Sequence, residues 1–304
     1  MKKVLVTGAT GFLGYSALKV LLAKSFEVVA VDHVRSAPRQ AGVKWYTADL
    51  LEPGTPERLI RDTKPSHLLH FAWYMRPEDY RQSPDNLSWC SASVDLIRHF
   101  ALYGGLRAVL CGTCFEYDDR YGFCSEKLTP IRPGSLYGIC KNSLRQMALA
   151  FAEHSQLSMA WGRAFFLYGP WEAQKRLVPN VIVNLLRNLP ANCSHGEQIR
   201  DFLHVEDGAS AFVALLESKV CGEVNIASGV PLKLKDIIWR IADELDAREL
   251  INLGAIGTLP TEPPVLLADV RRLRDEVGWQ PRFSVDEGLR QTIQWWRSAL
   301  SISS

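Results

Sequence analysis

Lys3-Val-Leu-Val-Thr7 is a short β-rich run, and Gly8-Ala-Thr-Gly11-Phe-Leu-Gly14 follows it directly. The next stretch, from Phe12 to Ala23, is amphipathic and predicts a helix. Glycines between a strand and a helix allow a tight turn and a close approach of the backbone to phosphate, while the start of the helix offers free N–H groups and a positive dipole end. We therefore predict that a dinucleotide pyrophosphate binds at this turn, to Gly8, Thr10, Gly11, Phe12, Leu13 and Gly14.

The second predicted strand, Glu27–Asp32, ends in a carboxylate. A carboxylate at this place accepts hydrogen bonds from the adenosine ribose and repels a 2′-phosphate, so Asp32 favours NAD over NADP. Arg35 is close enough in sequence to weaken that preference, and the alternative role of Asp32 is a solvated residue at a strand end. Asp49 and Leu50 follow the third predicted strand and can meet the adenine or form a simple turn.

Strands and helices alternate over the first half of the chain. Strands are expected at 3–7, 27–32, 43–47, 67–72, 106–111 and 157–163, and helices at 12–23, 86–103 and 137–154. This alternation predicts an α/β fold with a doubly wound parallel sheet of the Rossmann type. Further helices, near 178–188, 207–218, 234–245 and 285–300, are separated by loops rich in Pro and Gly. We interpret residues 1–166 as an NAD(P)-binding domain and 167–304 as a smaller substrate-binding lobe, with an approximate boundary that segments can cross.

Composition restricts the partners and the compartment. The chain has 304 residues, of which 47% are hydrophobic, and a net charge of +2. Such a chain can bury a large core, and its small charge gives no reason to expect nucleic acid or an anionic membrane as partner. No apolar stretch approaches the roughly 18–20 residues of a membrane span, and the N-terminal residues lead directly into a strand, so we expect a cytoplasmic protein.

The seven cysteines do not indicate a disulfide framework, because their number is odd and the chain is long. Cys111-Gly-Thr-Cys114 has the spacing of a redox motif. It follows an apolar run and has no second Cys or His pair at zinc spacing nearby, so we expect no metal site.

Tyr137 and Lys141 stand four residues apart in the predicted helix 137–154, so their side chains share one face. An ammonium beside a phenol favours the phenolate and can lower the pKa of the tyrosine from its usual value of about 10. Such a tyrosine can exchange a proton with a sugar or alcohol hydroxyl while a hydride moves elsewhere. Taken alone, the pair is equally compatible with a surface contact on a helix.

Several motifs occur together and in a fixed order: Gly8-x-x-Gly11-x-x-Gly14, Asp32, Asp49, His70-Phe71-Ala72, Thr113, Tyr137-x-x-x-Lys141, Tyr168-Gly-Pro170 and Arg200-Asp-Phe-Leu-His-Val. In this combination the chain resembles the extended short-chain dehydrogenase/reductase family. It is most similar to the NAD-dependent epimerases and dehydratases that act on nucleotide sugars. The resemblance runs from residue 3 to about residue 297.

The resemblance implies a role for each catalytic candidate. Thr113 would hydrogen-bond the reacting sugar oxygen, Tyr137 would act as general acid/base, and Lys141 would bind the nicotinamide ribose and lower the pKa of the tyrosine. Thr113 can alternatively cap the local backbone. Phe71 and Ala72 would contact the cofactor, NAD, which would carry the hydride.

Three positions depart from the family pattern. Dehydratases of the family usually have an Asp–Glu pair directly after the catalytic Thr, but this chain has Cys114-Phe115 there and Glu116 one place later, which disfavours dehydration. Phe166 stands where many relatives have an Asn that touches the sugar diphosphate, and Leu259 where they have a phosphate-binding Arg. An aliphatic side chain cannot replace a bidentate phosphate partner.

The candidate substrate-binding residues are Trp73, Thr113, Phe166 and Arg200. Arg200 can hold a diphosphate, with Lys175 or Arg176 adding charge, or it can form a salt bridge within the smaller lobe. Trp73 and Phe166, together with Tyr74 and Trp171, can form an aromatic wall against the sugar or belong to the core.

The expected function is NAD(P)(H)-dependent hydride transfer at C4 of a nucleotide-linked hexose. Phe166 favours a 4-ketoreductase, which needs fresh cofactor in each turnover, because it indicates a site unlike that of galactose epimerases. Asp32 favours a 4-epimerase that keeps its NAD, because biosynthetic reductases often use NADPH. A reductase of a non-sugar carbonyl and a non-catalytic NAD-binding regulator are further alternatives, the latter disfavoured because Tyr137 and Lys141 are both present.

The helix at 137–154 also carries an apolar stripe formed by Cys140, Leu144, Met147 and Phe151. Burial against the sheet explains part of this stripe. In the family that the chain resembles, this helix and the one at 86–103 pair with their copies in a four-helix bundle, which implies a homodimer.

Overall fold

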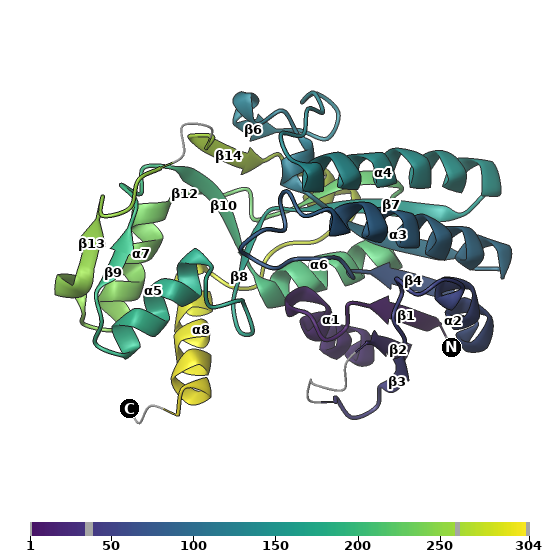
Figure 1. Cartoon of the computed structure of the whole chain (residues 1–304), viewed down its shortest axis with the longest axis horizontal. Coiled ribbons are helices and arrows are strands. Elements are labelled where there is room, and N and C mark those ends of the chain that lie inside the picture. The colour runs from purple at the N-terminus through teal and green to yellow at the C-terminus, as the bar shows by residue number, and fades with distance from the viewer. Residues whose placement is uncertain (1, 34–38, 259–261, 302–304) are drawn as a thin grey trace.

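Seven parallel strands form the sheet at the centre of the larger domain, in the order β11-β7-β5-β4-β1-β2-β3 (Figure 1). The computed structural model describes residues 2–33, 39–258 and 262–301. The strands are β1 (Lys3–Thr7), β2 (Glu27–Asp32), β3 (Lys44–Thr47), β4 (His67–His70), β5 (Arg107–Thr113), β7 (Ser158–Ala164) and β11 (Gly222–Ile226). The predicted doubly wound parallel sheet is confirmed.

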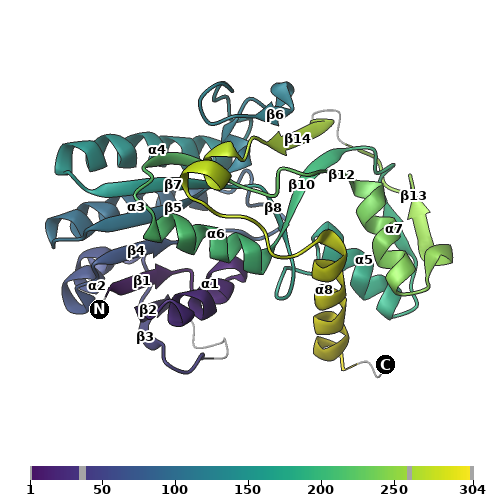
Figure 2. The same ribbon diagram turned by 180° about the vertical axis from the view of Figure 1, so that it is seen from behind.

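Helices cover both faces of this sheet, which explains why strands such as Val4-Leu5-Val6 are apolar without alternation. One face carries α2 (Thr55–Thr63), α3 (Asp85–Leu102) and α4 (Leu136–Ser155), and the opposite face carries α1 (Phe12–Ala23) and α6 (Val205–Glu217) (Figures 1 and 2).

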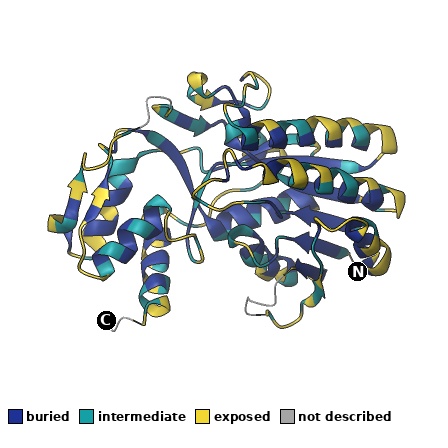
Figure 3. Cartoon of the chain, viewed as in Figure 1, coloured by how far each residue is buried: buried dark blue, intermediate teal, exposed yellow. Residues whose placement is uncertain are grey.

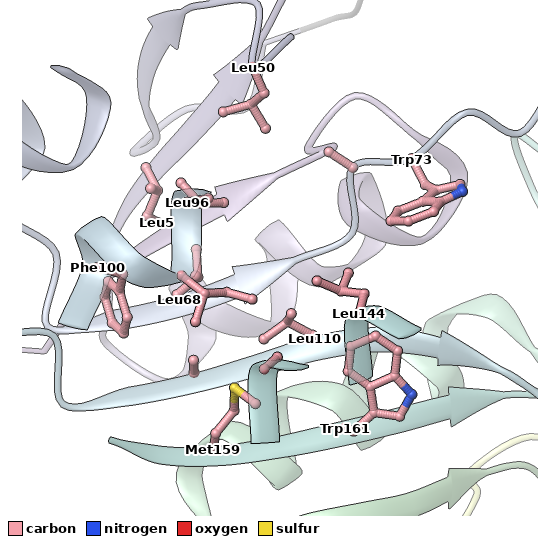
Figure 4. Packing of buried hydrophobic residues seen from close by; sticks show 14 of the residues in the cluster. Leu5, Leu50, Leu68, Trp73, Leu96, Phe100, Leu110, Leu144, Met159 and Trp161 are labelled. Atoms are coloured by element: carbon pink, nitrogen blue, oxygen red, sulfur yellow. The ribbon is translucent and has the colours of Figure 1, made fainter. Parts of the chain in front are cut away.

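A core lies between the sheet and the helices α3 and α4. Figure 4 shows Leu96 and Phe100 of α3 and Leu144 of α4 packed with Leu68 and Trp161 of the strands. The burial pattern agrees, because the inner sides of the helices are dark blue and the outer sides of α3 and α4 are largely yellow (Figure 3).

The smaller lobe lies beside the sheet and has its own core (Figure 1). Its helices are α5 (Leu177–Leu186), α7 (Leu234–Glu244) and α8 (Val285–Ala299). A second sheet connects this lobe with the larger domain. Its five strands are β6 (Phe123–Cys124), β8 (Phe166–Tyr168), β10 (Ile199–His204), β12 (Pro231–Lys233) and β14 (Val265–Ala268). A second pair consists of β9 (Ala191–Cys193) and β13 (Ile251–Leu253), and short helical turns cover Cys114–Glu116, Asp119–Tyr121, Arg248–Leu250 and Arg272–Glu276.

The chain crosses back from the smaller lobe to the larger domain. Helix α6 packs on α1, and β11 pairs with β7. In addition, the ring of Phe212 in α6 lies 5.1 Å from that of Phe71, which follows β4. The helix predicted at 207–218 therefore belongs to the larger domain and not to the smaller lobe, because an amphipathic pattern predicts a helix without saying which surface it covers. Strand β11 was missed because the buried Asn225 interrupts its apolar run; this side chain donates hydrogen bonds to the carbonyls of Cys124 and Asp269.

Two further features bear on function. All seven cysteines are free, and the part of the chain that the structure describes has no group of three His, Cys, Asp or Glu side chains that could hold a metal ion. Within the same described ranges, no helix combines the length and the apolar character needed to cross a bilayer.

The order of the strands reverses direction between β1 and β4. In an open parallel sheet, the loops on the two sides of such a point leave in opposite directions and open a crevice at the carboxyl ends of the strands. The crevice of this protein is thus expected beside Thr7 and His70, the last residues of β1 and β4.

We expect Leu144→Ala to lower the free energy of unfolding by about 2–5 kcal/mol, because Leu144 is 0% exposed and its loss leaves a cavity against the sheet. Leu128 is 78% exposed, and Leu128→Ala should change the free energy by less than about 0.5 kcal/mol. Urea unfolding of both variants measures the difference, and equal stabilities would contradict the packing.

Candidate active site

A cleft of about 820 Å³ opens at the switch point of the sheet, with walls from the larger domain and the smaller lobe. All the predicted site residues line it: Gly8, Thr10, Gly11, Phe12, Leu13, Gly14, Asp32, Asp49, Leu50, Phe71, Ala72, Trp73, Thr113, Tyr137, Lys141, Phe166 and Arg200. Segments far apart in the sequence therefore meet around one space.

The glycine turn is tightly constrained at its first and last glycine. Gly8 has a φ of +66°, and a Cβ there would lie 2.6 Å from the backbone nitrogen of Ala72. A Cβ on Gly14 would lie 2.1 Å from the carbonyl oxygen of Gly8. Helix α1, which follows, has no side-chain cap and no acidic residue in its first turn. Its free N–H groups at the cleft fit the pyrophosphate of NAD.

The adenosine end of the cleft is formed by the ends of β2 and β3. Asp32 is buried, and the Thr10 hydroxyl donates a hydrogen bond of 3.4 Å to its carboxylate. The Asp49 carboxylate accepts a hydrogen bond of 2.9 Å from the backbone of Leu51, so Asp49 forms a turn while it lines the cleft. Arg35 lies outside the described residues.

His70 holds the two strands at the switch point together. Its Nδ1 lies 2.6 Å from the Thr7 hydroxyl, and its Nε2 lies 2.9 Å from the Ser93 hydroxyl of α3. Burial lowers the pKa of His70 to about 3, so the ring is neutral. It fixes the segment that carries Phe71 and Ala72 into the cleft.

Thr113 and Tyr137 come together where β5 ends and α4 begins. Ser135 starts α4 by accepting a hydrogen bond of 3.2 Å from the backbone of Gly138. The Tyr137 side chain is 5% exposed and, like Thr113, lies in the wall of the cleft. Thr113 also caps the local backbone, since its hydroxyl accepts a hydrogen bond of 3.3 Å from the Phe115 N–H. The alternative role is therefore confirmed, and the catalytic role stays a prediction.

The protonation of Tyr137 differs from the expectation. Burial raises the pKa of the phenol well above its usual value, Cys111 raises it further, and the neighbouring Thr113 side chain opposes the rise. The Lys141 ammonium donates to the Cys111 carbonyl at 2.8 Å and lies 3.8 Å from the ring centroid of Trp73. Burial lowers the pKa of Lys141 to about 8. The predicted fall in the tyrosine pKa is thus absent, because desolvation outweighs the effect of the ammonium.

Glu116 is held by a fully buried network. Its carboxylate accepts hydrogen bonds from the Thr113 N–H (2.9 Å), the Trp161 indole (2.9 Å) and the Arg163 guanidinium (2.8 Å), and it is 0% exposed. Glu116 therefore fixes the loop after β5 and cannot reach a substrate. Cys114 is also buried, and burial raises the pKa of its thiol.

Arg200 and Phe166 form part of the wall from the smaller lobe. The Arg200 guanidinium donates to Glu262 at 2.9 Å and lies 5.5 Å from the ring centroid of Phe166. The predicted internal salt bridge is thus present, and Arg200 still lines the cleft. Leu259 lies outside the described residues.

The aromatic wall is only partly as expected. Trp73, Tyr74 and Phe166 line the cleft. The ring of Trp171 instead lies between Tyr15 and Trp295, with centroid distances of 5.4 and 5.0 Å, and lines a second hollow. Its backbone explains this direction, because Trp171 has a φ of +71°.

Several lining residues had no motif to mark them: Tyr80, Arg81 and Glu172. The Arg81 guanidinium lies 4.4 Å from the ring centroid of Phe115, and that of Arg176 lies 4.8 Å from the ring centroid of Tyr80. Tyr80 and Arg81 follow the strand at the switch point, and this position in the predicted sheet was the one available signal for them.

Residues 4–227 match the sequence model of the NAD dependent epimerase/dehydratase family. The chain belongs to this family. Its members are NAD-dependent enzymes of nucleotide-sugar metabolism, and the glycine turn and Asp32 of this chain fit NAD.

Individual relatives are distant but cover the whole chain. The probable dTDP-glucose 4,6-dehydratase of Sinorhizobium fredii is 24% identical over 97% of this chain and 92% of its own length. CDP-abequose synthase of Salmonella typhimurium is 24% identical over 96% of this chain and 97% of its own. The structure of UDP-glucose 4-epimerase from Thermus thermophilus in complex with NAD has the same fold, with a TM-score of 0.85, 24% identity, and coverage of 98% of this chain and 99% of that one.

We expect Glu116→Gln to lower the free energy of unfolding by about 3 kcal/mol, because it leaves the buried Arg163 charge without its main partner. Glu276 pairs with Arg272 at the surface, so Glu276→Gln should cost less than about 1 kcal/mol. Urea unfolding compares the two variants, and a loss at Glu116 no larger than that at Glu276 would be inconsistent with the buried network.

Proposed function

We propose that this family member transfers a hydride between NAD(H) and C4 of a nucleotide-linked hexose, as a 4-ketoreductase. The observation that carries the proposal is the meeting of the buried side chains of Thr113 and Tyr137 in a cleft that extends from the glycine turn to the smaller lobe. The matched relatives named above act, by their names, on UDP-, dTDP- or CDP-linked sugars, which supports a nucleotide sugar as substrate.

The residues of this chain have distinct tasks in that reaction. NAD, when bound, supplies the nicotinamide that gives or accepts the hydride. Thr113 holds the reacting sugar oxygen, and Tyr137 gives or takes its proton; the raised pKa of Tyr137 suits proton donation in the direction of reduction. Lys141 is anchored on the Cys111 carbonyl at the end of β5, in position to bind the nicotinamide ribose.

Loss of water from the substrate is disfavoured on structural grounds. Elimination needs a second acid or base near the reacting carbons. The two residues after Thr113 are Cys114, which is buried with a raised thiol pKa, and Phe115, which has no ionisable group. Glu116 is engaged with Arg163 and Trp161.

A 4-epimerase that retains its NAD is the second candidate. Asp32 favours it, because a buried carboxylate at the adenosine end of the cleft disfavours the 2′-phosphate of NADPH. Arg200 beside Phe166 supports a phosphorylated substrate in both cases, against a non-sugar carbonyl compound.

A panel of nucleotide sugars distinguishes the candidates. We expect 4-keto-hexoses linked to UDP, dTDP or CDP to be reduced with one NADH oxidised per product, as followed at 340 nm and by mass spectrometry. Epimerisation of a nucleotide hexose without added cofactor would overturn the reductase. Tyr137→Phe should lower kcat by about 10²–10⁴-fold with the affinity for NADH unchanged; an unchanged kcat would contradict the role of Tyr137.

We also propose a homodimer formed through α3 and α4. The apolar stripe of α4 is divided, because Cys140 and Leu144 are buried against the sheet. Exposed apolar side chains remain on the outer side: Ile139 (48%) and Met147 (46%) of α4 and Leu87 (58%) of α3. These side chains would be covered by a second copy of the two helices.

We expect light scattering to give twice the mass of one chain for the native protein. The double variant Ile139→Asp, Met147→Asp should be monomeric, because it puts charges into the proposed interface. Leu128→Asp alters an apolar residue that lies outside the two helices and is more exposed than Ile139 or Met147, and this variant should stay dimeric. A native protein of single-chain mass would contradict the dimer.

A further inference from the structure

Glu172 lies in the cleft without a role in the chemistry described above. It stands on the loop between β8 and α5 and lines the cleft on the side of the smaller lobe. The residue is partly exposed, but its Oε2 atom is fully buried and has no hydrogen-bond partner among the described residues. The backbone N–H of Glu172 donates a hydrogen bond of 3.3 Å to the Gly169 carbonyl.

The loop directs this carboxyl group towards the cleft. Trp171 has the left-handed φ of +71°, which is costly for a bulky residue and persists only where the surroundings impose it. The stacking of Trp171 between Tyr15 and Trp295 provides that constraint. Because Trp171 is anchored in the second hollow, the next side chain along the loop lies in the active-site cleft.

The neighbours of Glu172 connect it to the catalytic tyrosine. Arg176, four residues along the same loop, is within electrostatic reach of the carboxyl group and lies 4.8 Å from the ring centroid of Tyr80. The ring of Tyr80 packs edge-on against Tyr137 at 5.2 Å. A series of neighbouring side chains in the wall of the cleft thus leads from Glu172 to Tyr137.

A buried carboxyl oxygen without a partner destabilises the free protein, and such exceptions occur mainly at functional sites. We propose that Glu172 donates a hydrogen bond to an oxygen of the sugar in the bound nucleotide sugar and so helps to determine which sugar is accepted. This inference rests on the proposed function.

The chemistry of the site indicates a donor. Burial raises the pKa of Glu172 to about 8, and the positive charge of Arg176, the charged group that faces it, opposes the rise. The carboxyl group is thus mostly protonated at pH 7. A protonated carboxyl group carries one O–H, and no described residue accepts a hydrogen bond from Oε2, which leaves the group able to donate to a ligand oxygen.

Calorimetry on the NAD-loaded protein tests the proposal without turnover. The probes are UDP and dTDP, and glucose and 4-keto-6-deoxyglucose linked to each of them. The quantity compared is the Kd of the free nucleotide divided by the Kd of the corresponding nucleotide sugar, because this ratio isolates the contribution of the sugar to binding. We expect Glu172→Ala to lower this ratio about tenfold, as for the loss of one hydrogen bond, and Glu172→Gln, which keeps a neutral donor, to retain it.

Glu78→Ala is the matched control, because Glu78 is a half-exposed acid that pairs with Lys175 of the same loop at 2.5 Å without lining the cleft. It should leave the ratio unchanged. An unchanged ratio in Glu172→Ala would overturn the proposal, equal losses in the Ala and Gln variants would overturn the donor assignment, and a parallel loss of NAD affinity would indicate a structural role instead. If the native protein binds none of the sugars more tightly than its nucleotide, the proposed function fails as well.

Discussion

The close contact between the glycine turn and the segment after β4 is the constraint on which the site depends. Gly8 has no Cβ, so its backbone can lie against that of Ala72, and the two strand ends stay together at the switch point. His70 strengthens the same junction through Thr7 and Ser93. The loop after β4 then carries Trp73, Tyr80 and Arg81 across the cleft to the start of α4, where the Arg81 carbonyl accepts a hydrogen bond from the backbone of Tyr137.

The nucleotide half of this arrangement could be predicted from the sequence because its signals are local. A strand, a glycine turn and a helix adjoin one another at residues 3–23, and each restricts the next. The doubly wound sheet followed from the alternation of strands and helices, and the grouping of Thr113 with Tyr137 followed from the family pattern. The destinations of α6 and β11 could not be predicted, because they depend on which apolar surfaces meet after the chain has left the sheet. The raised pKa of Tyr137 is equally a property of the assembled cleft, since it arises from burial by distant segments.

Glu116 illustrates how a small shift in sequence changes the use of a residue. One place earlier it would correspond to the family's acidic pair beside the catalytic Thr, whereas here it forms the interior of the loop with Arg163 and Trp161. Its carboxylate is committed to the fold and does not line the cleft, whereas Arg81 of the loop after β4 and Glu172, Arg176, Arg200 and Glu262 of the smaller lobe do. The position of an acid relative to Thr113 thus decides whether it belongs to the core or to the cleft.

The return of the chain through α6 and β11 has a consequence for how this protein can be divided. Strand β7 is covered on its outer edge by β11, and α6 covers the face that includes Ala160 and Val109. A fragment that stopped at residue 166 would leave β7 as a bare edge, open to pairing with other chains, and would uncover an apolar face of the sheet. The larger domain is therefore completed only by segments that follow part of the smaller lobe in the chain, and the cleft between the two parts is built into the path of the chain.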